Sequence, residues 1–308
     1  EQMANLTREA LRAGGLGFST SRFYGHVDKA GNLVPGTRAA AKEMLALGNA
    51  FKGLGHGTLE IISDYLENDD ELAWIEQIMR DTGRTVTTLA SPRAVKIWER
   101  ASQLEQQGLD LRPQIGARPA SILMSLEGTI NPLAIYPSYK AIRSLPIEEQ
   151  VKLLRDPSFR AKLKADTPRH HRNRDARKFT TSFDEMYPLD EAMTYEPTQA
   201  DSIQGLADST HRHHLEVLMD VLADRQPILF FFGGYPGDLN QQFSLLNHER
   251  SVFGLSDGGA HCGVLCDASV PTYMLSYLTR DRTRGDTMPL EFIVNQMTQS
   301  TASVYGLH

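Results

Sequence analysis

Cysteine is scarce in this chain. The 308 residues contain two, Cys262 and Cys266, and two thiols cannot build the disulfide framework of a small secreted domain. No second pair accompanies them to complete a zinc site, so we interpret each as a small buried residue. The first residues, Glu1 to Asn5, lack the basic-then-apolar pattern of a secretion signal. We therefore expect a reducing compartment, the cytoplasm.

Long apolar runs and an excess of positive charge are missing as well. No stretch approaches the roughly 18–20 apolar residues that span a bilayer. The net charge of −6 and the pI near 5.9 give no general attraction to nucleic acid or to anionic membranes. We therefore expect neither as a partner. The length is sufficient for one large α/β domain or two smaller ones.

Several motifs of common α/β enzymes are also absent. No G-x-G-x-x-G follows the first predicted strand and no Walker A loop is present, which argues against dinucleotide and nucleoside triphosphate sites. No G-x-S-x-G elbow appears, which argues against a serine hydrolase of the α/β type. A metal-independent barrel lyase needs a lysine at a strand end, and we find no convincing candidate.

The chain does contain a regular alternation of short apolar runs and amphipathic stretches. This alternation favours a parallel sheet with helices outside it. A closed barrel of such units needs eight strands, whereas six are recognised here. An open doubly wound sheet could hold six, but the abrupt start fits a (β/α)8 TIM-like barrel that lacks its first two units. The six predicted strands are residues 16–20, 59–62, 85–89, 111–115, 228–232 and 252–256.

Helices are predicted from the spacing of apolar residues and from caps. The clearest lies between Asn68, a suitable N-cap, and Gly83, a suitable stop. Between residues 116 and 208 the alternation breaks down, and residues 167–178 form a dense basic run. We predict that residues 1–308 form one partial barrel, with an irregular insertion or lid at about 116–208. Further helices are predicted at 6–13, 37–54, 92–107, 210–222, 272–279 and 290–298.

The most informative stretch is Val252 to Asp267. A short apolar run ends in Ser256 and Asp257, followed by two glycines and His261. Glycines permit a close approach of ligand to backbone, and barrel chemistry lies at the carboxyl ends of strands. Asp257 is therefore a candidate to bind a metal or accept a proton. Its structural alternative is a helix cap or a turn.

Other polar residues follow the predicted strands and would converge with Asp257. Carboxylates and imidazoles together suit a metal site or acid–base catalysis. Structural alternatives stay open: a helix dipole or arginine partner for Glu60, a structural hydrogen-bond acceptor for Glu127 and a solvated loop for His26. His211, His213 and His214 are interpreted as capping or solvent-facing. The converging set comprises Arg22, His26, Glu60, Glu127, Tyr235, Asp257 and His261.

Three segments resemble the N-acyl-D-amino-acid deacylase (D-aminoacylase-like) family of the amidohydrolase superfamily. Gly15 to Arg22, read with His26 and Val34-Pro-Gly36, is similar to the family's GALGFSTSR…H…VPG stretch. Leu255 to His261 is similar to its LSDGGAH signature. The segment from Tyr277 to Gly285, and then Thr298 to Leu307, resembles its last barrel helices.

The resemblance implies a metal-dependent barrel that hydrolyses amide C–N bonds of N-acyl (D-)amino acids or related small amides. A divalent ion, usually Zn²⁺, would polarise the carbonyl and lower the pKa of a bound water. Asp257 matches the family's proton-accepting aspartate, and Asp257 and Glu60 are its candidate metal ligands here. Second-shell or substrate contacts would come from Arg22, His26, Glu60, Glu127, Tyr235 and His261.

Two differences between this sequence and the family pattern support an alternative hypothesis. The family's first strand carries a His-x-His metal pair, and nothing before Gly15 resembles it. Residues 86–90 and 111–115 also lack the metal-binding histidines that some relatives carry. We therefore expect the missing N-terminal part of the barrel as a partner, with an oligomer also allowed. The competing hypothesis is a non-catalytic barrel scaffold or binding subunit that has lost its metal site.

Overall fold

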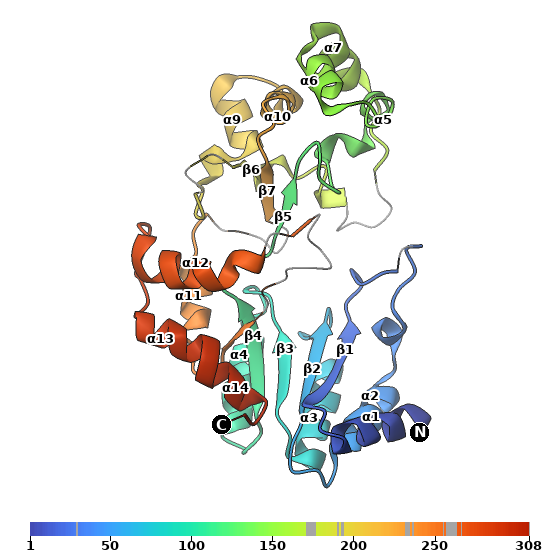
Figure 1. The fold of residues 1–308 in the computed structure, drawn as a ribbon, viewed down its shortest axis with the longest axis vertical. Coiled ribbons are helices and arrows are strands. Elements are labelled where there is room, and N and C mark those ends of the chain that lie inside the picture. The colour runs from blue at the N-terminus through green and yellow to red at the C-terminus, as the bar shows by residue number, and fades with distance from the viewer. Residues whose placement is uncertain are drawn as a thin grey trace.

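The chain forms a mixed α/β structure in which a parallel sheet carries a second, separate lobe (Figure 1). The computed structural model describes residues 1–28, 30–170, 177–189, 191, 194–231, 235, 237–254, 256, 264–265 and 267–307. Within those residues, no helix combines the length and apolar character that a bilayer-spanning segment needs.

The main sheet has five strands in the order β1-β2-β3-β4-β8, and every neighbouring pair is parallel. Each strand therefore lies beside the next parallel strand of the chain, without the reversal of order that marks a doubly wound sheet. The predicted parallel sheet is confirmed to this extent. Its strands are β1 (Gly17–Arg22), β2 (Thr58–Ser63), β3 (Val86–Leu89), β4 (Leu111–Gly116) and β8 (Val252–Gly254).

Helices cover one face of this sheet. Alternate strand residues, such as Leu59 and Ile61 of β2, pack into one apolar core with Trp74 and Ile75 of α3 and Trp98 of α4. The period of two in a strand sends the residues between them to the opposite face. The helices before and between the strands are α1 (Gln2–Arg12), η1 (Pro35–Arg38), α2 (Ala41–Gly48), η2 (Asn49–Phe51), α3 (Asp69–Thr82), α4 (Lys96–Glu105) and α11 (Asn240–Leu246).

The helix predicted between Asn68 and Gly83 is confirmed at both ends. Gly83 adopts φ +64°, the left-handed conformation that glycine reaches at little cost. Asn68 precedes the first turn, but its side chain makes no capping hydrogen bond. The helix predicted over 37–54 is instead broken into η1, α2 and η2, so a continuous apolar face did not guarantee a continuous helix.

The C-terminal segments return to the main sheet. Val270, Tyr273 and Leu278 join its core, and the Thr58 hydroxyl at the start of β2 donates to the Val304 carbonyl at 2.6 Å. These contacts place the end of the described chain against the amino end of β2. The segments are η6 (Asp267–Ser269), α12 (Val270–Ser276), the π-helical η7 (Tyr277–Asp281), α13 (Leu290–Asn295), the π-helical η8 (Gln296–Ser300) and α14 (Thr301–Val304).

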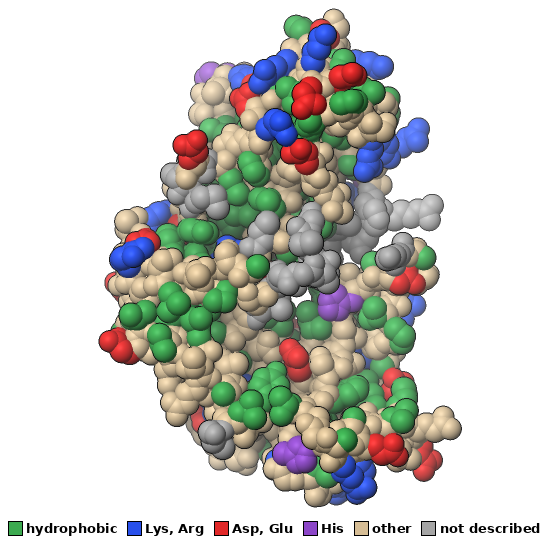
Figure 2. Space-filling model, viewed as in Figure 1, with side chains coloured by type: hydrophobic (Ala, Val, Ile, Leu, Met, Phe, Trp, Pro, Cys, Tyr) green, Lys and Arg blue, Asp and Glu red, His purple; other side chains and the backbone are tan. Residues whose placement is uncertain are grey.

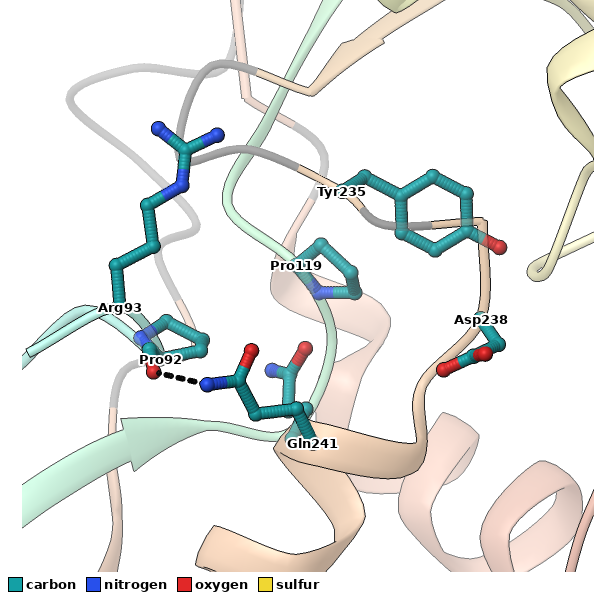
Figure 3. Close-up of a pocket in the computed structure, with 7 residues that line it drawn as sticks. Pro92, Arg93, Pro119, Tyr235, Asp238 and Gln241 are labelled. Atoms are coloured by element: carbon teal, nitrogen blue, oxygen red, sulfur yellow. Dashed lines mark hydrogen bonds between the residues drawn. The ribbon is translucent and has the colours of Figure 1, made fainter. Parts of the chain in front are cut away.

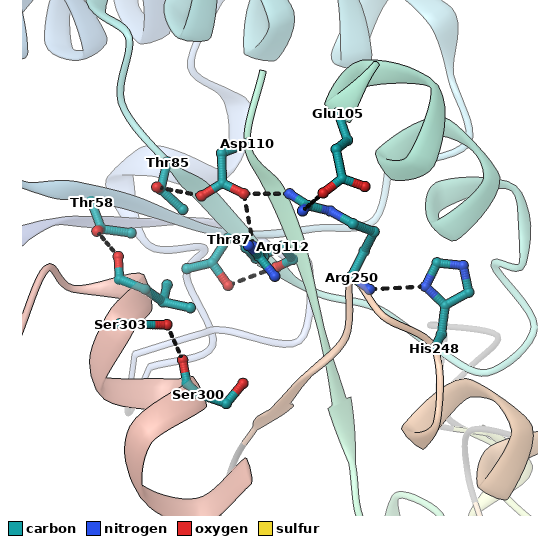
Figure 4. Close-up of polar contacts among 11 residues, drawn as sticks. Thr58, Thr85, Thr87, Glu105, Asp110, Arg112, His248, Arg250, Ser300 and Ser303 are labelled. Atoms are coloured by element: carbon teal, nitrogen blue, oxygen red, sulfur yellow. Dashed lines mark hydrogen bonds and ion pairs between the residues drawn. The ribbon is translucent and has the colours of Figure 1, made fainter. Parts of the chain in front are cut away.

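An ionic network fixes the amino end of the sheet (Figure 4). Asp110, just before β4, accepts hydrogen bonds from the Thr85 hydroxyl and the Arg112 guanidinium at 2.7 Å each. Arg250, 5% exposed, pairs with Asp110 and with Glu105. Burial alone would raise the pKa of Asp110, but the Thr85 hydroxyl and the two arginines lower it below its ordinary value. In barrel enzymes this end of the sheet serves stability.

The second lobe contains its own antiparallel sheet, in the order β5-β7-β6, and a separate apolar core. It lies beyond the edge of the main sheet at which β4 ends and the chain runs on to β5 (Figure 1). Its elements are β5 (Ser121–Met124), η3 (Pro132–Ile135), α5 (Pro137–Lys140), α6 (Ile147–Arg155), α7 (Pro157–Ala165), η4 (Phe183–Glu185), β6 (Met186–Pro188), η5 (Gln199–Asp201), α9 (Ile203–Thr210), α10 (His214–Ala223) and β7 (Ile228–Phe231).

One strand prediction is wrong in its placement. Residues 228–232 were expected to join the parallel sheet, whereas β7 pairs antiparallel with β5 and β6. A short, wholly apolar run is buried on both faces in either kind of sheet, so its composition does not identify its neighbours. The parallel sheet consequently has five described strands. The lobe reaches Phe231, past the predicted boundary at 208.

A buried ion pair joins the lobe to the main body. Arg282 donates through Nε to Oε1 of Glu196 at 2.8 Å, and each side chain is 1% exposed. The Tyr277 hydroxyl donates to the same oxygen at 3.0 Å, and the Leu239 backbone N–H donates to Oε2 at 3.0 Å. Arg282 also donates to Oδ1 of Asn240 at 2.8 Å. Three segments distant in sequence thus meet at one carboxylate.

Replacing Arg282 by methionine would leave the Glu196 carboxylate buried without its cation. We expect Arg282→Met to lower the free energy of unfolding by about 3–5 kcal/mol in urea titrations followed by circular dichroism. Arg280→Met is the matched control, because Arg280 is 75% exposed and pairs with the exposed Asp281; its change should stay below about 0.5 kcal/mol. Equal stability of the two variants would contradict this role for the pair.

Candidate functional site

The face of the sheet opposite the helices carries polar side chains. Glu60 lies beside Ser19 and Thr87 in the register of the parallel strands, and its neighbours Leu59 and Ile61 point into the helix-side core. The Gln114 amide donates to Glu60 Oε1 at 3.1 Å and to Thr87 Oγ1 at 3.0 Å. In a barrel this face would be the interior.

Glu60 is the predicted metal ligand that the structure describes. Burial, and then the charge of Glu60, raise the pKa of Tyr305, which places the phenol within electrostatic reach of this carboxylate. Across the described ranges, no three His, Cys, Asp or Glu side chains are grouped so that they could hold a metal ion. The other predicted ligand, Asp257, lies outside those ranges, as does His261.

The end of β8 lies beside the end of β4 in the parallel sheet. Gly254 is the register partner of Gly116 at the carboxyl end of β4. Beyond it, the Ser256 hydroxyl donates to the Asp267 carbonyl at 2.8 Å, and Arg118 pairs with the Asp267 carboxylate at 2.7 Å. Ser256 and Asp267 are therefore joined to each other, and Asp267 to Arg118, at the carboxyl edge of the main sheet.

Arg22, predicted to contact substrate, is engaged with the protein itself. Its Nε donates to Oε1 of Glu71 at 2.7 Å, its guanidinium also bonds the Ala39 carbonyl, and the two ionic side chains are 12% and 4% exposed. Glu71 further accepts from the Ser63 hydroxyl at 2.6 Å and from the Trp74 indole at 3.1 Å. Arg22 thus ties the end of β1 to the start of α3.

His26 stays at the carboxyl edge of β1, as predicted. Its Nδ1 lies 2.6 Å from the Ser21 hydroxyl oxygen, and its ring meets the Phe23 ring edge-on at a centroid distance of 5.1 Å. Figure 2 shows the face between lobe and sheet as hollowed, with histidine, acidic and hydrophobic side chains around the hollow. His26 is therefore a partly buried, oriented imidazole.

Tyr235 lines a cavity of about 150 Å³ at the same edge (Figure 3). Pro92 and Arg93 follow β3, Pro119 follows β4, and Gln241 closes the cavity by donating to the Pro92 carbonyl at 3.0 Å. The buried Tyr235 hydroxyl has no hydrogen-bond partner among the described residues. Burial, and then the charge of Glu196, raise its pKa. The phenol is thus a neutral donor at physiological pH.

Glu127 does not lie near the other predicted site residues that the structure describes. It follows β5 in the second lobe and makes an exposed ion pair with Arg225 at 3.1 Å, with side chains 65% and 52% exposed. The contact fits the structural alternative for this residue, a hydrogen-bond acceptor, here for an arginine at the surface.

Of the three clustered histidines, His211 and His213 are exposed at helix ends as expected, whereas His214 is partly buried. His211 adopts φ +53° at the C-terminus of α9, and the His213 imidazole accepts from the Leu215 N–H at the start of α10. His214 stacks on Phe183, and burial lowers its pKa. The helix therefore begins after His213 rather than after the predicted cap, Thr210.

Sequence reasoning missed Ser21, Gln114, Glu71 and the Arg118–Asp267 pair. Gln114 could have been found from strand periodicity, because it shares the period-two face with Arg112 in a predicted strand. Glu71 and Asp267 carry no local signal, because the arginines that pair with them, Arg22 and Arg118, lie 49 and 149 residues away in the sequence. Comparisons of the chain with protein-family models, curated proteins and solved structures found no match.

Because Arg22 neutralises a nearly buried carboxylate, its loss should act on stability. We expect Arg22→Met to lower the free energy of unfolding by about 3 kcal/mol in chemical denaturation. Arg93→Met, at the exposed rim of the Tyr235 cavity, serves as control and should change it by less than about 0.5 kcal/mol. If Arg22→Met is as stable as the wild-type protein, the structural role of Arg22 is contradicted and a contact with substrate becomes the better explanation.

Proposed function

We propose that this chain is part of the catalytic barrel of a metal-dependent amidohydrolase that cleaves an amide C–N bond. The observation that carries the proposal is the uninterrupted strand order β1-β2-β3-β4-β8, with polar residues on the face away from the helices. A (β/α)8 barrel has this order and such an interior. The proposal requires three further strands to close the barrel.

The substrate class follows from the resemblance to the N-acyl-D-amino-acid deacylases. N-acyl (D-)amino acids carry an amide carbonyl, which accepts hydrogen bonds, and a free carboxylate, which pairs with a cation. Arg93 at the rim of the Tyr235 cavity suits the carboxylate, and His26 and Tyr235, which follow β1 and β7, remain proposed substrate contacts. The lobe beyond this edge would exclude water from the reaction.

Glu60 and Asp257 are the proposed metal ligands of this chain, and oxygen ligands suit a divalent ion such as Zn²⁺. When bound, the ion would polarise the carbonyl and lower the pKa of water to about 7. Asp257 would accept the proton of the attacking water and pass it to the leaving amine. Gln114 holds the Glu60 carboxylate in place from the next strand but one.

Metal content and hydrolysis together test the proposal. We expect the full-length polypeptide to retain about one equivalent of zinc and to hydrolyse members of a panel of N-acyl-D- and N-acyl-L-amino acids. Removal of zinc by a chelator should abolish turnover, and added zinc should restore it. A protein that takes up no zinc on supplementation and hydrolyses none of the panel would be a non-catalytic scaffold or binding subunit.

The role of Asp257 has its own test. We expect Asp257→Asn to lower kcat by about 10²–10⁴-fold with the melting temperature unchanged, because the amide cannot accept the proton. Asp281→Asn removes an exposed carboxylate at the surface and should leave kcat unchanged. Near-normal turnover by Asp257→Asn would contradict the assignment of Asp257 as the general base.

A further inference from the structure

The second lobe contains a cavity that the proposed function does not use. Its volume is about 310 Å³, and it lies between the stretch after β5, the η3–α5 segment and the residues before η4. This volume is at the lower end of the roughly 300–1,000 Å³ that is typical of small-molecule sites. The apolar and aromatic side chains that line it are those of Leu126, Ile130, Ala134, Ile135, Tyr139 and Phe179.

A buried chain of hydrogen bonds fixes one wall of this cavity. The Asn131 amide donates to the Tyr139 hydroxyl at 2.8 Å, and that hydroxyl donates to Oε1 of Gln150 at 3.0 Å. The Gln150 amide in turn donates to the Arg143 carbonyl at 3.2 Å. The Tyr139 hydroxyl is thus fully used within the wall, and the side chain offers its ring to a ligand. A wall held in this way is preorganised, which lowers the entropic cost of binding.

Arg143 supplies the charge at this cavity. It is the charged residue among the described residues that line the cavity, and it is exposed, so the cavity reaches the surface. Within the described part of the chain, no carboxylate forms an ion pair with its guanidinium. Burial raises the pKa of Tyr139, and the charge of Arg143 opposes that rise, so the guanidinium lies within electrostatic reach of the wall. A guanidinium of this kind can bind a carboxylate through two parallel N–H donors.

We propose that this cavity binds a small organic anion, namely an apolar chain or ring that ends in a carboxylate. The apolar body would be removed from water against Leu126, Ile130 and Phe179, and the carboxylate would stay at the rim, paired with Arg143. The site does not rest on the proposed function, because its lining belongs to the second lobe, whereas Glu60 belongs to β2 of the main sheet.

Calorimetric titration of the full-length polypeptide with octanoate tests this site. We expect one equivalent of octanoate to bind, and octanol, which has the same chain without the charge, to bind about tenfold more weakly. Arg143→Gln should weaken octanoate binding by about tenfold and leave octanol binding unchanged. Lys140→Gln is the matched control, because it removes the same charge at the end of α5 from a side chain that does not line the cavity. Its affinity for octanoate should stay within about twofold of the wild-type value.

A second variant tests the apolar part of the site. Ala134→Leu places a larger side chain in the cavity and should weaken the binding of both octanoate and octanol, with circular dichroism used to check that the variant is folded. The proposal is overturned if octanoate does not bind, if octanol binds as tightly, or if Arg143→Gln and Lys140→Gln have equal affinities. Unchanged binding by folded Ala134→Leu would also overturn it. If Ala134→Leu does not fold, the exposed Arg143 still provides the test.

Discussion

The buried carboxylate of Glu196 is the contact on which the arrangement of the chain depends. It lies between β6 and η5 of the second lobe, yet its partners are the residue before α11, Tyr277 of η7 and Arg282 just after η7. A charge removed from water is tolerated only when its oxygens are fully paired. Glu196 therefore fixes the ends of three segments at one point, and the Tyr235 cavity forms above the start of α11.

The second constraint is the strict alternation of the parallel strands. One set of residues builds an apolar core with the helices, and the other places Glu60, Thr87 and Gln114 on the opposite face in one hydrogen-bonded row. The row is held by its own hydrogen bonds, because the buried Thr87 hydroxyl accepts from Gln114 and donates to the Arg112 carbonyl. It gives the proposed barrel interior its chemical character.

The polar side chains at the carboxyl edge of the main sheet fall into two groups, according to whether they form ion pairs within the protein. Arg22 and Arg118 are held by buried or half-buried carboxylates and shape the edge, whereas the His26 ring is held by Ser21 and Phe23 and the Tyr235 hydroxyl is buried. Sequence reasoning placed Arg22 and His26 at this edge correctly, because both follow a recognisable strand. It could not separate their roles, because the partner of Arg22 is Glu71, forty-nine residues further along the chain.

The sequence by itself determined the parallel strands, the helix between Asn68 and Gly83, and the edge at which polar residues gather. These features depend on local periodicity, on caps and on the polarity of a strand. Only the tertiary structure decided that β7 belongs to the antiparallel sheet and that Glu127 pairs with Arg225 at the surface. The physical reason is that packing between distant segments determines which strands are neighbours and which charged side chains pair. A local pattern of residues contains no information about that packing.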